Sequence, residues 1–563
     1  MEKVWLKHYL PEIPAEIDPD RFNSITEVFD YAVKTFGDRP AYTCMGVTIT
    51  YKQLDAYACQ FASFLQQRGL KRGDHIALQM PNLLQYPVCV FGAFRAGLVV
   101  VNVNPLYTPR EMEHQLSDSQ SKAIVIDSMF ASKLDEIRAQ LPGLKHIVVA
   151  DFGCLFPPLK RTVVGLVLKY VQKKVPAYRL PGHVTLPNAL KAGCTRAHEL
   201  IHLQGHELAF IQYTGGTTGV SKGAMLTHRN LVANMEQAGA YLGPSFTAGR
   251  EVMITALPLY HIYALTVNCL MMTRLGGHQI LIPNPRDLKG FVKELAKHPF
   301  TVMTAVNTLY NGLLSQPEFC ALDFSTLKVA SAGGMALQRA VALKFEEVTG
   351  RKVCEGFGLT EASPITHSNP PWGENRIGTV GLPMPSTEVR LVDDAGNDVP
   401  LGERGEIWIK GPQVMKGYFN RPDETAKTLT PDGWLMTGDI GLMQPDGYFQ
   451  IVDRKKEMIV VSGFKVFPNE VEDILTQHPG IHEAAVIGVP DEHSGEAVMA
   501  FIVKKDPALT EAVVRDYIHH NFTGYKRPKY IEFRTELPKS NVGKILRRPL
   551  REAELARIAA GGS

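Results

Sequence analysis

Short apolar segments alternate with helical patterns along the first two thirds of this chain, and this alternation limits the fold more than any other feature. Apolar runs typical of buried strands occupy residues 75–80, 97–102, 123–127, 252–257, 279–282 and 302–306. Helical periodicity fills residues 86–96 and 111–117, and a further helix is predicted over 291–296. Strands that alternate with helices in this way form parallel sheets covered by helices, so an α/β fold is predicted.

The pattern changes past residue 375, where closely spaced glycine and proline residues separate short strands such as 406–410. This spacing of glycine and proline residues predicts a smaller antiparallel, barrel-like β region over about 376–455. From about residue 457 strands and helices mix again, which predicts a compact α+β domain. Because 563 residues exceed one core, we expect a large N-terminal domain, 1–455, and a small mobile C-terminal domain, 456–563.

Charge and cysteine content exclude several classes of protein. The 60 Lys and Arg residues nearly balance the 57 Asp and Glu residues, so nothing favours a nucleic-acid-binding protein. The 8 cysteines form no C-x-x-C pair, which disfavours a disulfide framework or a cysteine metal site and fits a reducing cytoplasm. The N-terminus lacks the apolar core of a signal peptide, and no apolar run is long enough for a membrane-spanning helix.

Residues 159–175 combine valines and leucines with five basic side chains. A basic amphipathic helix of this kind can lie in the interface of an anionic membrane. An ordinary surface helix with a solvated basic face is the alternative, and both interpretations stay open. The expected location is therefore the cytoplasm, with peripheral contact at the inner face of the cell membrane through this segment.

The run Tyr213-Thr-Gly-Gly-Thr-Thr-Gly-Val-Ser-Lys-Gly-Ala is typical of a phosphate-binding loop. Its glycines let backbone N–H groups approach an anion closely and form a nest, its hydroxyls add donors, and Lys222 adds a positive charge. The spacing of a P-loop NTPase is absent because Lys222 is followed by Gly223. A flexible surface loop has the same composition, so the prediction of a polyphosphate site depends on the motifs that follow.

Four further motifs carry suitable chemistry. Glu361, in Phe357-Gly-Leu-Thr-Glu, is a hard oxygen ligand of the kind that Mg²⁺ prefers. Asp439, in Thr-Gly-Asp, is able to accept hydrogen bonds from ribose hydroxyls. Arg454 and Lys456 lie in a short charged run, and Lys544 follows a glycine near the C-terminus. Each of these has an ordinary alternative, namely a solvated loop carboxylate, a turn or a solvated charge run.

Together and in this order, these motifs resemble those of the acyl-adenylate-forming superfamily of acyl-CoA synthetases, adenylation domains and luciferases. The resemblance covers almost the whole chain. Asp432-Gly-Trp-Leu-Met-Thr-Gly-Asp-Ile-Gly, continued by residues 451–456, is similar to the signature of fatty-acyl-CoA synthetases. The segments 81–87 and 101–111 resemble the long-chain fatty acid–CoA ligases of bacteria. The loop departs slightly from the common pattern, because Gly216 stands where serine is frequent.

The resemblance implies two half-reactions. A carboxylate attacks the α-phosphorus of ATP to give acyl-AMP and pyrophosphate, and the CoA thiolate then displaces AMP. Because two anions meet in the first step, positioned cations and N–H donors matter more than a protein nucleophile. ATP and CoA are thus implied as co-substrates, Mg²⁺ as a cofactor, and entry of the product into fatty acid β-oxidation as its use.

The family pattern assigns roles to residues of this chain. Lys222 would hold the β- and γ-phosphates, Thr214 and Glu361 would hold Mg²⁺, and Lys544 would bind the α-phosphate and the attacking carboxylate. The catalytic residues expected from the resemblance are Lys544, Thr214, Glu361, Lys222 and Lys456. The expected ATP-binding residues are Tyr213, Thr214, Gly215, Gly216, Thr217, Thr218, Gly219, Ser221, Lys222, Gly223, Gly333, Gly334, Glu355, Gly356, Phe357, Gly358, Thr360, Asp439, Ile451, Arg454 and Lys544.

Lys544 belongs to the small domain and the phosphate loop to the large one, so adenylation requires the two domains to close. By analogy with the family, the small domain then turns about a hinge at Lys456 and presents Ser462, Gly463, Phe464 and Lys465 to CoA. For the acyl group the resemblance implies Tyr260, His261, Val306 and Gly334. His261 alone is equally well explained as a core histidine.

The leading hypothesis is a long-chain fatty acid–CoA ligase. A medium-chain or aryl-acid CoA ligase and an acyl-AMP ligase are the alternatives within the family. A luciferase-type oxygenase shares the adenylation step but has no positive support. A degenerate, non-catalytic fatty-acid-binding protein is disfavoured, because Lys222, Glu361, Asp439 and Lys544 are all present. Chain-length preference and oligomeric state are not indicated, and a homodimer stays open.

Overall fold

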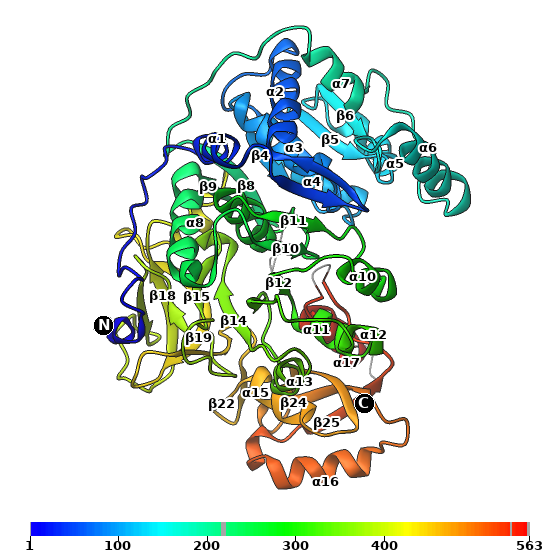
Figure 1. Cartoon of the computed structure of the whole chain (residues 1–563). Coiled ribbons are helices and arrows are strands. Elements are labelled where there is room, and N and C mark those ends of the chain that lie inside the picture. The colour runs from blue at the N-terminus through cyan, green and yellow to red at the C-terminus, as the bar shows by residue number, and fades with distance from the viewer. Residues whose placement is uncertain (1, 215–220, 541–542, 560–563) are drawn as a thin grey trace.

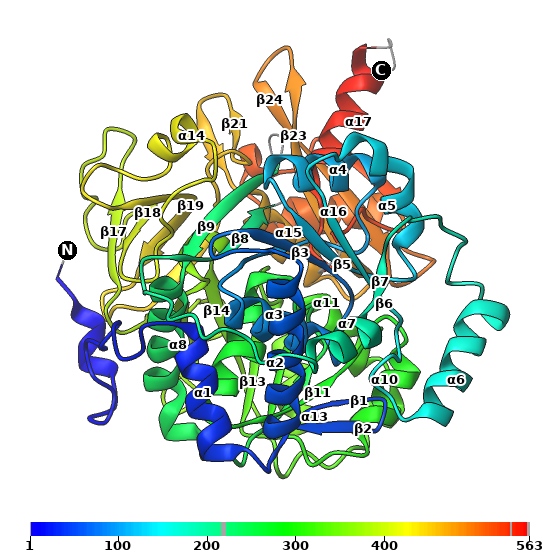
Figure 2. The same ribbon diagram turned by 90° about the horizontal axis from the view of Figure 1, so that it is seen from above.

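The computed structural model of the chain describes residues 2–214, 221–540 and 543–559. Two large α/β sheets, a small antiparallel sheet and a C-terminal α+β domain make up these residues (Figure 1). The predicted fold class is confirmed, with a large N-terminal domain followed by a smaller C-terminal one. In the view from above, the C-terminal strands lie beside the antiparallel sheet (Figure 2), and in Figure 1 the second sheet separates them from the first α/β sheet.

The first α/β sheet has seven strands in the order β7-β6-β5-β3-β4-β8-β9, parallel throughout except for the last pair. Its strands are β3 (His75–Gln79), β4 (Val99–Asn102), β5 (Ala123–Asp127), β6 (His146–Ala150), β7 (Val184–Thr185), β8 (Leu208–Thr214) and β9 (Lys222–Thr227). Its helices are α2 (Tyr51–Gln67), α3 (Gln85–Arg95), α4 (Pro109–Asp118), α5 (Ala131–Ile137), α6 (Pro158–Leu166) and α7 (Leu186–Gly193). The predicted strands at 75–80, 97–102 and 123–127 are confirmed.

The second sheet has nine strands in the order β16-β15-β14-β13-β12-β10-β11-β1-β2. It contains β1 (Pro40–Cys44), β2 (Val47–Thr50), β10 (Val252–Thr255), β11 (His278–Leu281), β12 (Val302–Ala305), β13 (Val329–Ala332), β14 (Val353–Gly358), β15 (Ile365–Ser368) and β16 (Leu382–Pro383). The strands from β1 to β14 across β11, β10, β12 and β13 are parallel, and antiparallel strands extend both edges.

The helices that accompany this sheet begin where the sequence supplies suitable caps. Thr227 forms a capping box with Asn230 directly after β9, so that α8 starts at His228. These helices are α1 (Ile25–Phe36), α8 (His228–Leu242), α9 (Met272–Leu275), α10 (Leu288–Leu295), α11 (Asn307–Leu314), α12 (Pro317–Cys320) and α13 (Arg339–Thr349), with a π-helix, η5 (Ala264–Met271). Asp287 caps α10, which confirms the helix start predicted at residues 284–287.

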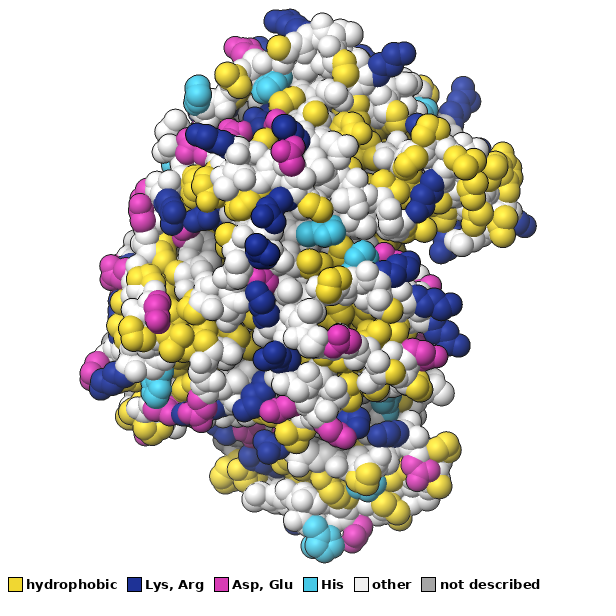
Figure 3. Space-filling view, viewed as in Figure 1, with side chains coloured by type: hydrophobic (Ala, Val, Ile, Leu, Met, Phe, Trp, Pro, Cys, Tyr) yellow, Lys and Arg dark blue, Asp and Glu magenta, His cyan; other side chains and the backbone are white. Residues whose placement is uncertain are grey.

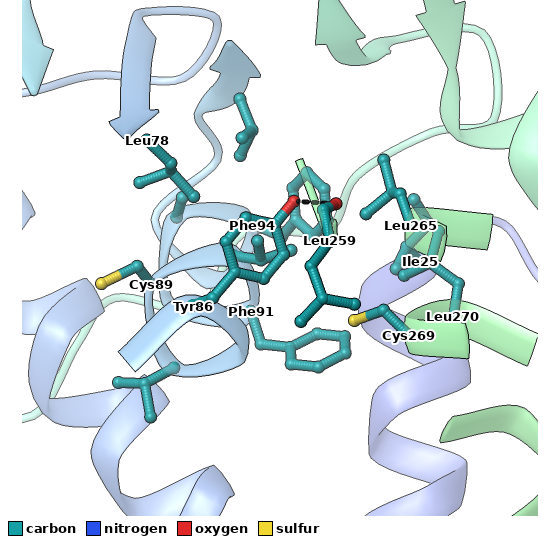
Figure 4. Packing of buried hydrophobic residues seen from close by; sticks show 14 of the residues in the cluster. Ile25, Leu78, Tyr86, Cys89, Phe91, Phe94, Leu259, Leu265, Cys269 and Leu270 are labelled. Carbon is teal, nitrogen blue, oxygen red and sulfur yellow. Dashed lines mark hydrogen bonds between the residues drawn. The ribbon is translucent and has the colours of Figure 1, made fainter. Parts of the chain in front are cut away.

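One hydrophobic core joins the two sheets. Side chains of α1, β3, α3 and η5 converge in it, with Tyr86, Phe91 and Phe94 from α3 facing Leu265 and Leu270 from η5 (Figure 4). All five of these side chains are almost completely buried. Burial of such large apolar groups is the main force holding the layers together.

The antiparallel region predicted past residue 375 is present. It is a four-stranded meander of β17 (Glu388–Val392), β18 (Gly405–Lys410), β19 (Leu435–Met443) and β20 (Phe449–Arg454), with the short helix α14 (Pro422–Ala426) between β18 and β19. Along β18 the burial alternates strictly, as expected for a sheet with one covered face.

The C-terminal domain packs helices on one five-stranded sheet. Its elements are β21 (Ile459–Val461), β22 (Phe464–Val466), α15 (Pro468–Thr476), β23 (Ile481–Asp491), β24 (Gly495–Lys504), α16 (Glu511–Asn521), β25 (Tyr530–Arg534) and α17 (Arg547–Ala559). Short 3₁₀ helices occur at η1 (Val4–His8), η2 (Arg138–Gln140), η4 (Gly243–Ser245), η6 (Thr360–Ala362) and η7 (Gly524–Lys526).

The segment 159–175 forms α6 and a π-helical continuation, η3 (Val167–Val171), that stand away from the body of the molecule in both ribbon views (Figures 1 and 2). No residue of either helix is buried. Apolar side chains face solvent here, with Leu159, Tyr170 and Val171 between 65% and 80% exposed, and they form the apolar patch at the right edge of Figure 3. Across the described ranges of the chain, no helix is long and apolar enough to cross a membrane.

Candidate functional site

A cavity of about 1450 Å³ lies where the second sheet, the antiparallel region and the C-terminal domain meet. Fifteen of the predicted site residues line it: Tyr213, Thr214, Lys222, Tyr260, His261, Gly333, Gly334, Gly356, Phe357, Gly358, Thr360, Glu361, Arg454, Lys456 and Lys544. They come from both domains, so the fold brings together groups that are up to 331 positions apart in the sequence. The size and mixed polarity of this cavity suit a substrate with a charged end and an apolar end.

The phosphate loop connects the ends of β8 and β9. Thr214 pairs with Lys222 in the last rung of this antiparallel pair, and the Ser221 hydroxyl donates to the Thr214 carbonyl at 2.6 Å. Five predicted ATP-binding residues, Gly215, Gly216, Thr217, Thr218 and Gly219, lie outside the described residues. Gly223 has a packing reason of its own, because a Cβ there would lie 2.5 Å from Ile211 Cγ2.

Lys222 and Glu361 are linked through Tyr418, a residue that follows Gly417 in the segment between β18 and α14. The Tyr418 hydroxyl donates to Glu361 Oε1 at 2.6 Å, and the Lys222 ammonium lies over the Tyr418 ring at 4.5 Å from its centre. Lys222 also donates to Glu424 Oε2 at 2.9 Å. The sequence did not indicate Tyr418 or Glu424, because an aromatic residue and a surface acid carry no distinguishing pattern until the fold places them beside Lys222.

Asp439 and Arg454 are paired residues on neighbouring strands, β19 and β20. Arg454 Nε lies 3.2 Å from Asp439 Oδ1, while Asp439 Oδ2 is buried without a hydrogen-bond partner among the described residues. Burial raises the pKa of Asp439, and the Arg454 charge opposes that shift. A buried carboxylate oxygen that still needs a donor is suited to a hydroxyl of a bound ligand.

Gly333, Gly334, Gly356 and Phe357 form one wall of the cavity. Gly334 has a φ of +81°, which favours glycine, and a Cβ on Gly333 would approach the Tyr263 ring to 3.2 Å. Glu355 points away from the cavity, since its carboxylate accepts the Leu337 N–H at 3.0 Å and burial raises its pKa to about 8. Glu355, Ile451 and Asp439 are not among the residues that line the cavity, although Gly438 and Arg454 beside Asp439 are.

Tyr260 and His261 reach the cavity from the segment that follows β10. Tyr86 anchors this segment by donating its hydroxyl to the Leu259 carbonyl at 2.8 Å (Figure 4). His261 is half-buried. Desolvation of its ring, together with the nearby Lys544 charge, lowers its pKa to about 4, so the imidazole is neutral at neutral pH.

The wall around these residues is largely apolar. It includes Ala238 and Leu242 from α8, Val267 and Met271 from η5, Met253 from β10, Val302 from β12 and Val329 from β13. Val306 is not part of this lining; its Cγ2 would lie 3.4 Å from a Cβ placed on Gly543 of the C-terminal domain. β12 ends at Ala305, and its alternate residues Val302 and Thr304 line the cavity, whereas Val306 lies at the N-cap position of α11.

Lys544 enters the cavity on a turn in which the Ser540 N–H donates to the Lys544 carbonyl at 2.7 Å. Burial, followed by the nearby Arg454 charge, lowers the pKa of Lys544 to about 8. Three residues later, Arg547 donates to Glu472 of α15, to Asp453 at 3.3 Å and to Glu457. This network ties the Lys544 turn to the segment that joins the two domains.

Ser462, Gly463, Phe464 and Lys465 lie at the turn between β21 and β22, away from the cavity lining. Ser462 and Gly463 have φ values of 48° and 85°, as a tight hairpin turn requires. Phe464 stacks on Tyr525 at 4.8 Å, and Lys465 lies 3.6 Å from Asp394. The cavity therefore holds Lys544 while this hairpin faces elsewhere.

The comparisons with known proteins agree with this geometry. Residues 29–419 match the family of AMP-binding enzymes, and residues 470–544 match the AMP-binding enzyme C-terminal domain. A long-chain-fatty-acid–CoA ligase of Yersinia pestis is 53% identical over 556 residues, and one of Salmonella typhimurium is 52% identical over 559, with 99% of each chain covered in both cases.

Solved structures share the whole fold. The crystal structure of an anthranilate CoA ligase in complex with anthranoyl-AMP superimposes with a TM-score of 0.85 at 26% identity, covering 97% of this chain and 100% of that one.

Proposed function

The chain belongs to the family of AMP-binding enzymes, and we propose that the cavity described above is where it makes acyl-CoA from long-chain fatty acids. The enzyme is a ligase that uses ATP to form an acyl-adenylate and then transfers the acyl group to CoA, with release of AMP and pyrophosphate. One observation carries the assignment of this site: Lys544 of the C-terminal domain shares a cavity with Lys222, Glu361 and His261 of the large domain.

For the first half-reaction, we assign the triphosphate to the end of the cavity near Lys222. Lys544 would stand at the α-phosphate and the attacking carboxylate, where negative charge develops. Asp439 would accept ribose hydroxyls through the oxygen that lacks a partner, with Arg454 holding the other oxygen. Gly333, Gly334 and Phe357 would frame the adenine.

The donor set fits a magnesium ion that is held mostly by substrate phosphates. Glu361 offers a carboxylate and Thr214 a hydroxyl at the cavity wall, and the described residues contain no cluster of three or more acidic, histidine or cysteine side chains that would form a complete metal cage. Mg²⁺ typically binds through one or two protein oxygens plus phosphates, and it neutralises phosphate charge when bound. Glu361 and Thr214 would hold it.

The alkyl chain would lie against the apolar residues of α8, η5 and β10. Each methylene transferred from water to such a surface contributes about 0.8 kcal/mol, so a long chain gains more than a short one. His261, which is neutral, would border the carboxylate end without adding a second positive charge.

For the second half-reaction, we infer that the C-terminal domain turns about Lys456 and carries Lys544 out of the cavity. The hairpin with Ser462, Gly463, Phe464 and Lys465 would then approach CoA. Its position away from the cavity is consistent with an adenylation arrangement, since CoA is not needed in that step. The large domain would end near residue 455 and the mobile one would begin at 456.

Peripheral membrane contact is part of the proposal, because fatty acids partition into bilayers and α6 exposes apolar and basic side chains together. The protein would work in the cytoplasm at the inner face of the membrane and supply acyl-CoA for β-oxidation.

The test is AMP release with Mg-ATP across octanoate, palmitate, oleate and 4-coumarate, each with and without CoA. We expect AMP and acyl-CoA formation with palmitate and oleate that depends on CoA. Pyrophosphate release without thioester would instead favour an acyl-AMP ligase, and preference for 4-coumarate an aryl-acid CoA ligase. No AMP release with any of the four acids would contradict the proposal.

A further inference from the structure

Lys222, the lysine assigned to the phosphates, is already held by an acid of this chain. Its ammonium donates to Glu424 Oε2 at 2.9 Å, and the Lys427 ammonium donates to the other oxygen, Oε1, at 2.9 Å. All three side chains line the cavity. One carboxylate thus bridges two lysines at the end of the cavity where the triphosphate is assigned.

The helix that carries Glu424 does not depend on this carboxylate. α14 has only five residues, and two threonine hydroxyls bind its backbone carbonyls. Thr425 donates to the Arg421 carbonyl at 2.9 Å, and Thr428 donates to the Glu424 carbonyl at 2.9 Å. The Lys222 and Glu424 side chains are 26% and 36% exposed. Ion pairs at such positions contribute little to folding, so a structural role does not account for the bridge.

Among the residues that the structure describes, Glu424 is the acid that forms an ion pair with Lys222. Glu361, the acid on the other side of Tyr418, accepts the Tyr418 hydroxyl instead. Hydrogen bonds from Lys427 and Lys222 lower the pKa of Glu424 to about 2, so this carboxylate is ionised at neutral pH.

We propose that the Glu424 carboxylate competes with the phosphates of ATP for Lys222 and Lys427. It binds both lysines in the enzyme without nucleotide and is displaced by the triphosphate. It binds both lysines again when pyrophosphate leaves. This inference rests on the proposed role of Lys222 in binding phosphates. A triphosphate replaces the single carboxylate readily, because it offers more charge and more acceptor oxygens for charge-assisted hydrogen bonds.

The exchange has a kinetic consequence. A competitor inside the site weakens the binding of ATP and of pyrophosphate together, because both must displace the same carboxylate. Weaker product binding speeds the release of pyrophosphate, at the cost of a higher working concentration of ATP. Glu424 is therefore a residue that tunes the affinity for phosphates.

The experiment compares Glu424→Gln with the wild-type enzyme. Glutamine keeps the shape and removes the charge. We expect the dissociation constant of Mg-ATP without fatty acid, and the inhibition constant of pyrophosphate, to fall about two- to fivefold, the range expected for an exposed ion pair. Asp423→Asn is the matched control, since it removes the same charge one position earlier, where no bond to Lys222 exists; its constants should not change.

Lys222→Ala separates this inference from the proposed function. If Lys222→Ala leaves Mg-ATP binding unchanged, the phosphate role of Lys222 and the inference both fall. If Lys222→Ala weakens binding while Glu424→Gln leaves it unchanged, the inference alone falls. If Glu424→Gln weakens binding as well, the inference also falls, and Glu424 then acts as a ligand on the nucleotide side. In the double variant the gain from Glu424→Gln should shrink, because the two residues are coupled.

Discussion

The charge of Lys544 depends on the burial of its side chain in the cavity. In the cavity, burial lowers its pKa to about 8 from the ordinary lysine value near 10.4. The ammonium form therefore predominates below pH 8 and is lost as the pH rises through it. His261 beside it stays neutral over the same range, because its pKa is lowered to about 4. Among these two neighbours, only the lysine supplies positive charge to the reacting groups at neutral pH.

We predict that kcat/KM for ATP in the adenylation half-reaction falls as the pH rises above about 8, since this constant reports groups of the free enzyme. Lys544→Arg should lower the rate but remove the fall, because arginine keeps its charge. The measurement is ATP–pyrophosphate exchange from pH 6.5 to 9.5.

Lys544→Ala should reduce adenylation by about 10² to 10³, as is typical for the loss of one group that stabilises developing charge. Thioester formation from supplied acyl-AMP should be spared. Equal loss of both half-reactions, or an unchanged pH profile in Lys544→Arg, would refute the role of Lys544.

At the scale of elements, two segments lie outside the hydrophobic core: the connection between the two domains, and α6 with η3. The segment from β20 to β21 joins the domains, and Arg547 binds its Asp453 and Glu457 from the C-terminal side. Burial raises the pKa of Asp453 to about 6. The other segment is α6 with η3, which is tied back through Lys160, whose ammonium donates to the Met45 carbonyl.

Lys456→Pro should impair thioester formation more than adenylation. Proline fixes φ near −65°, so it restricts a backbone position that a hinge rotation must change. The two half-reactions are measured separately, as pyrophosphate exchange and as thioester formation from acyl-AMP. A hinge at Lys456 is ruled out if thioester formation proceeds at the wild-type rate.

Removing basic residues from the α6 segment should weaken binding to anionic vesicles. The variant changes Arg161, Lys169, Lys173 and Lys174 to glutamine and keeps Lys160, which has the structural contact. Each basic residue contributes about 1 kcal/mol near an anionic surface, so we expect at least about a tenfold loss in sedimentation with vesicles that contain phosphatidylglycerol.

The control changes four exposed basic residues elsewhere on the large domain, namely Lys289, Lys293, Arg351 and Lys352. Equal binding by the two variants would contradict the membrane role of α6. Activity with a water-soluble short acid should be unaffected in both.

At the scale of the whole molecule, the cavity is lined by residues of both domains. Gly543 lies where the Lys544 turn touches the large domain, and a Cβ at this position would collide with Thr308 Oγ1. Its φ of +82° is also unfavourable for other residues. The closed arrangement thus depends on a glycine at the point of contact.

Gly543→Ala should reduce adenylation while leaving thioester formation from acyl-AMP largely intact. Gly524→Ala, at a position in the same domain with open space around the added methyl group, is the control. Thr308→Ala should restore part of the activity of Gly543→Ala, because it removes the collision but not the backbone strain. Loss of both half-reactions in Gly543→Ala would indicate misfolding rather than impaired closure.

The local sequence determined many of the helices and strands and several residues of the candidate site. The period of apolar residues predicts β3, α3, β5 and α10, because a buried strand and an amphipathic helix each impose their own spacing. Short motifs marked Lys222, Glu361, Arg454 and Lys544, since glycines, hydroxyls and charges in a fixed order follow from the chemistry of phosphates. These motifs also led to the family, which the comparisons confirm.

Tertiary structure alone decided which side chains meet. Tyr418 and Glu424 join Lys222 from a segment about 200 residues later, and no local pattern specifies such a contact. Val302 and Val306 look alike in sequence, yet only Val302 lines the cavity, because β12 ends at Ala305 and Val306 lies at the turn into α11. The lowered pKa of Lys544 likewise arises from burial between two domains, a property of the closed molecule and not of any segment in it.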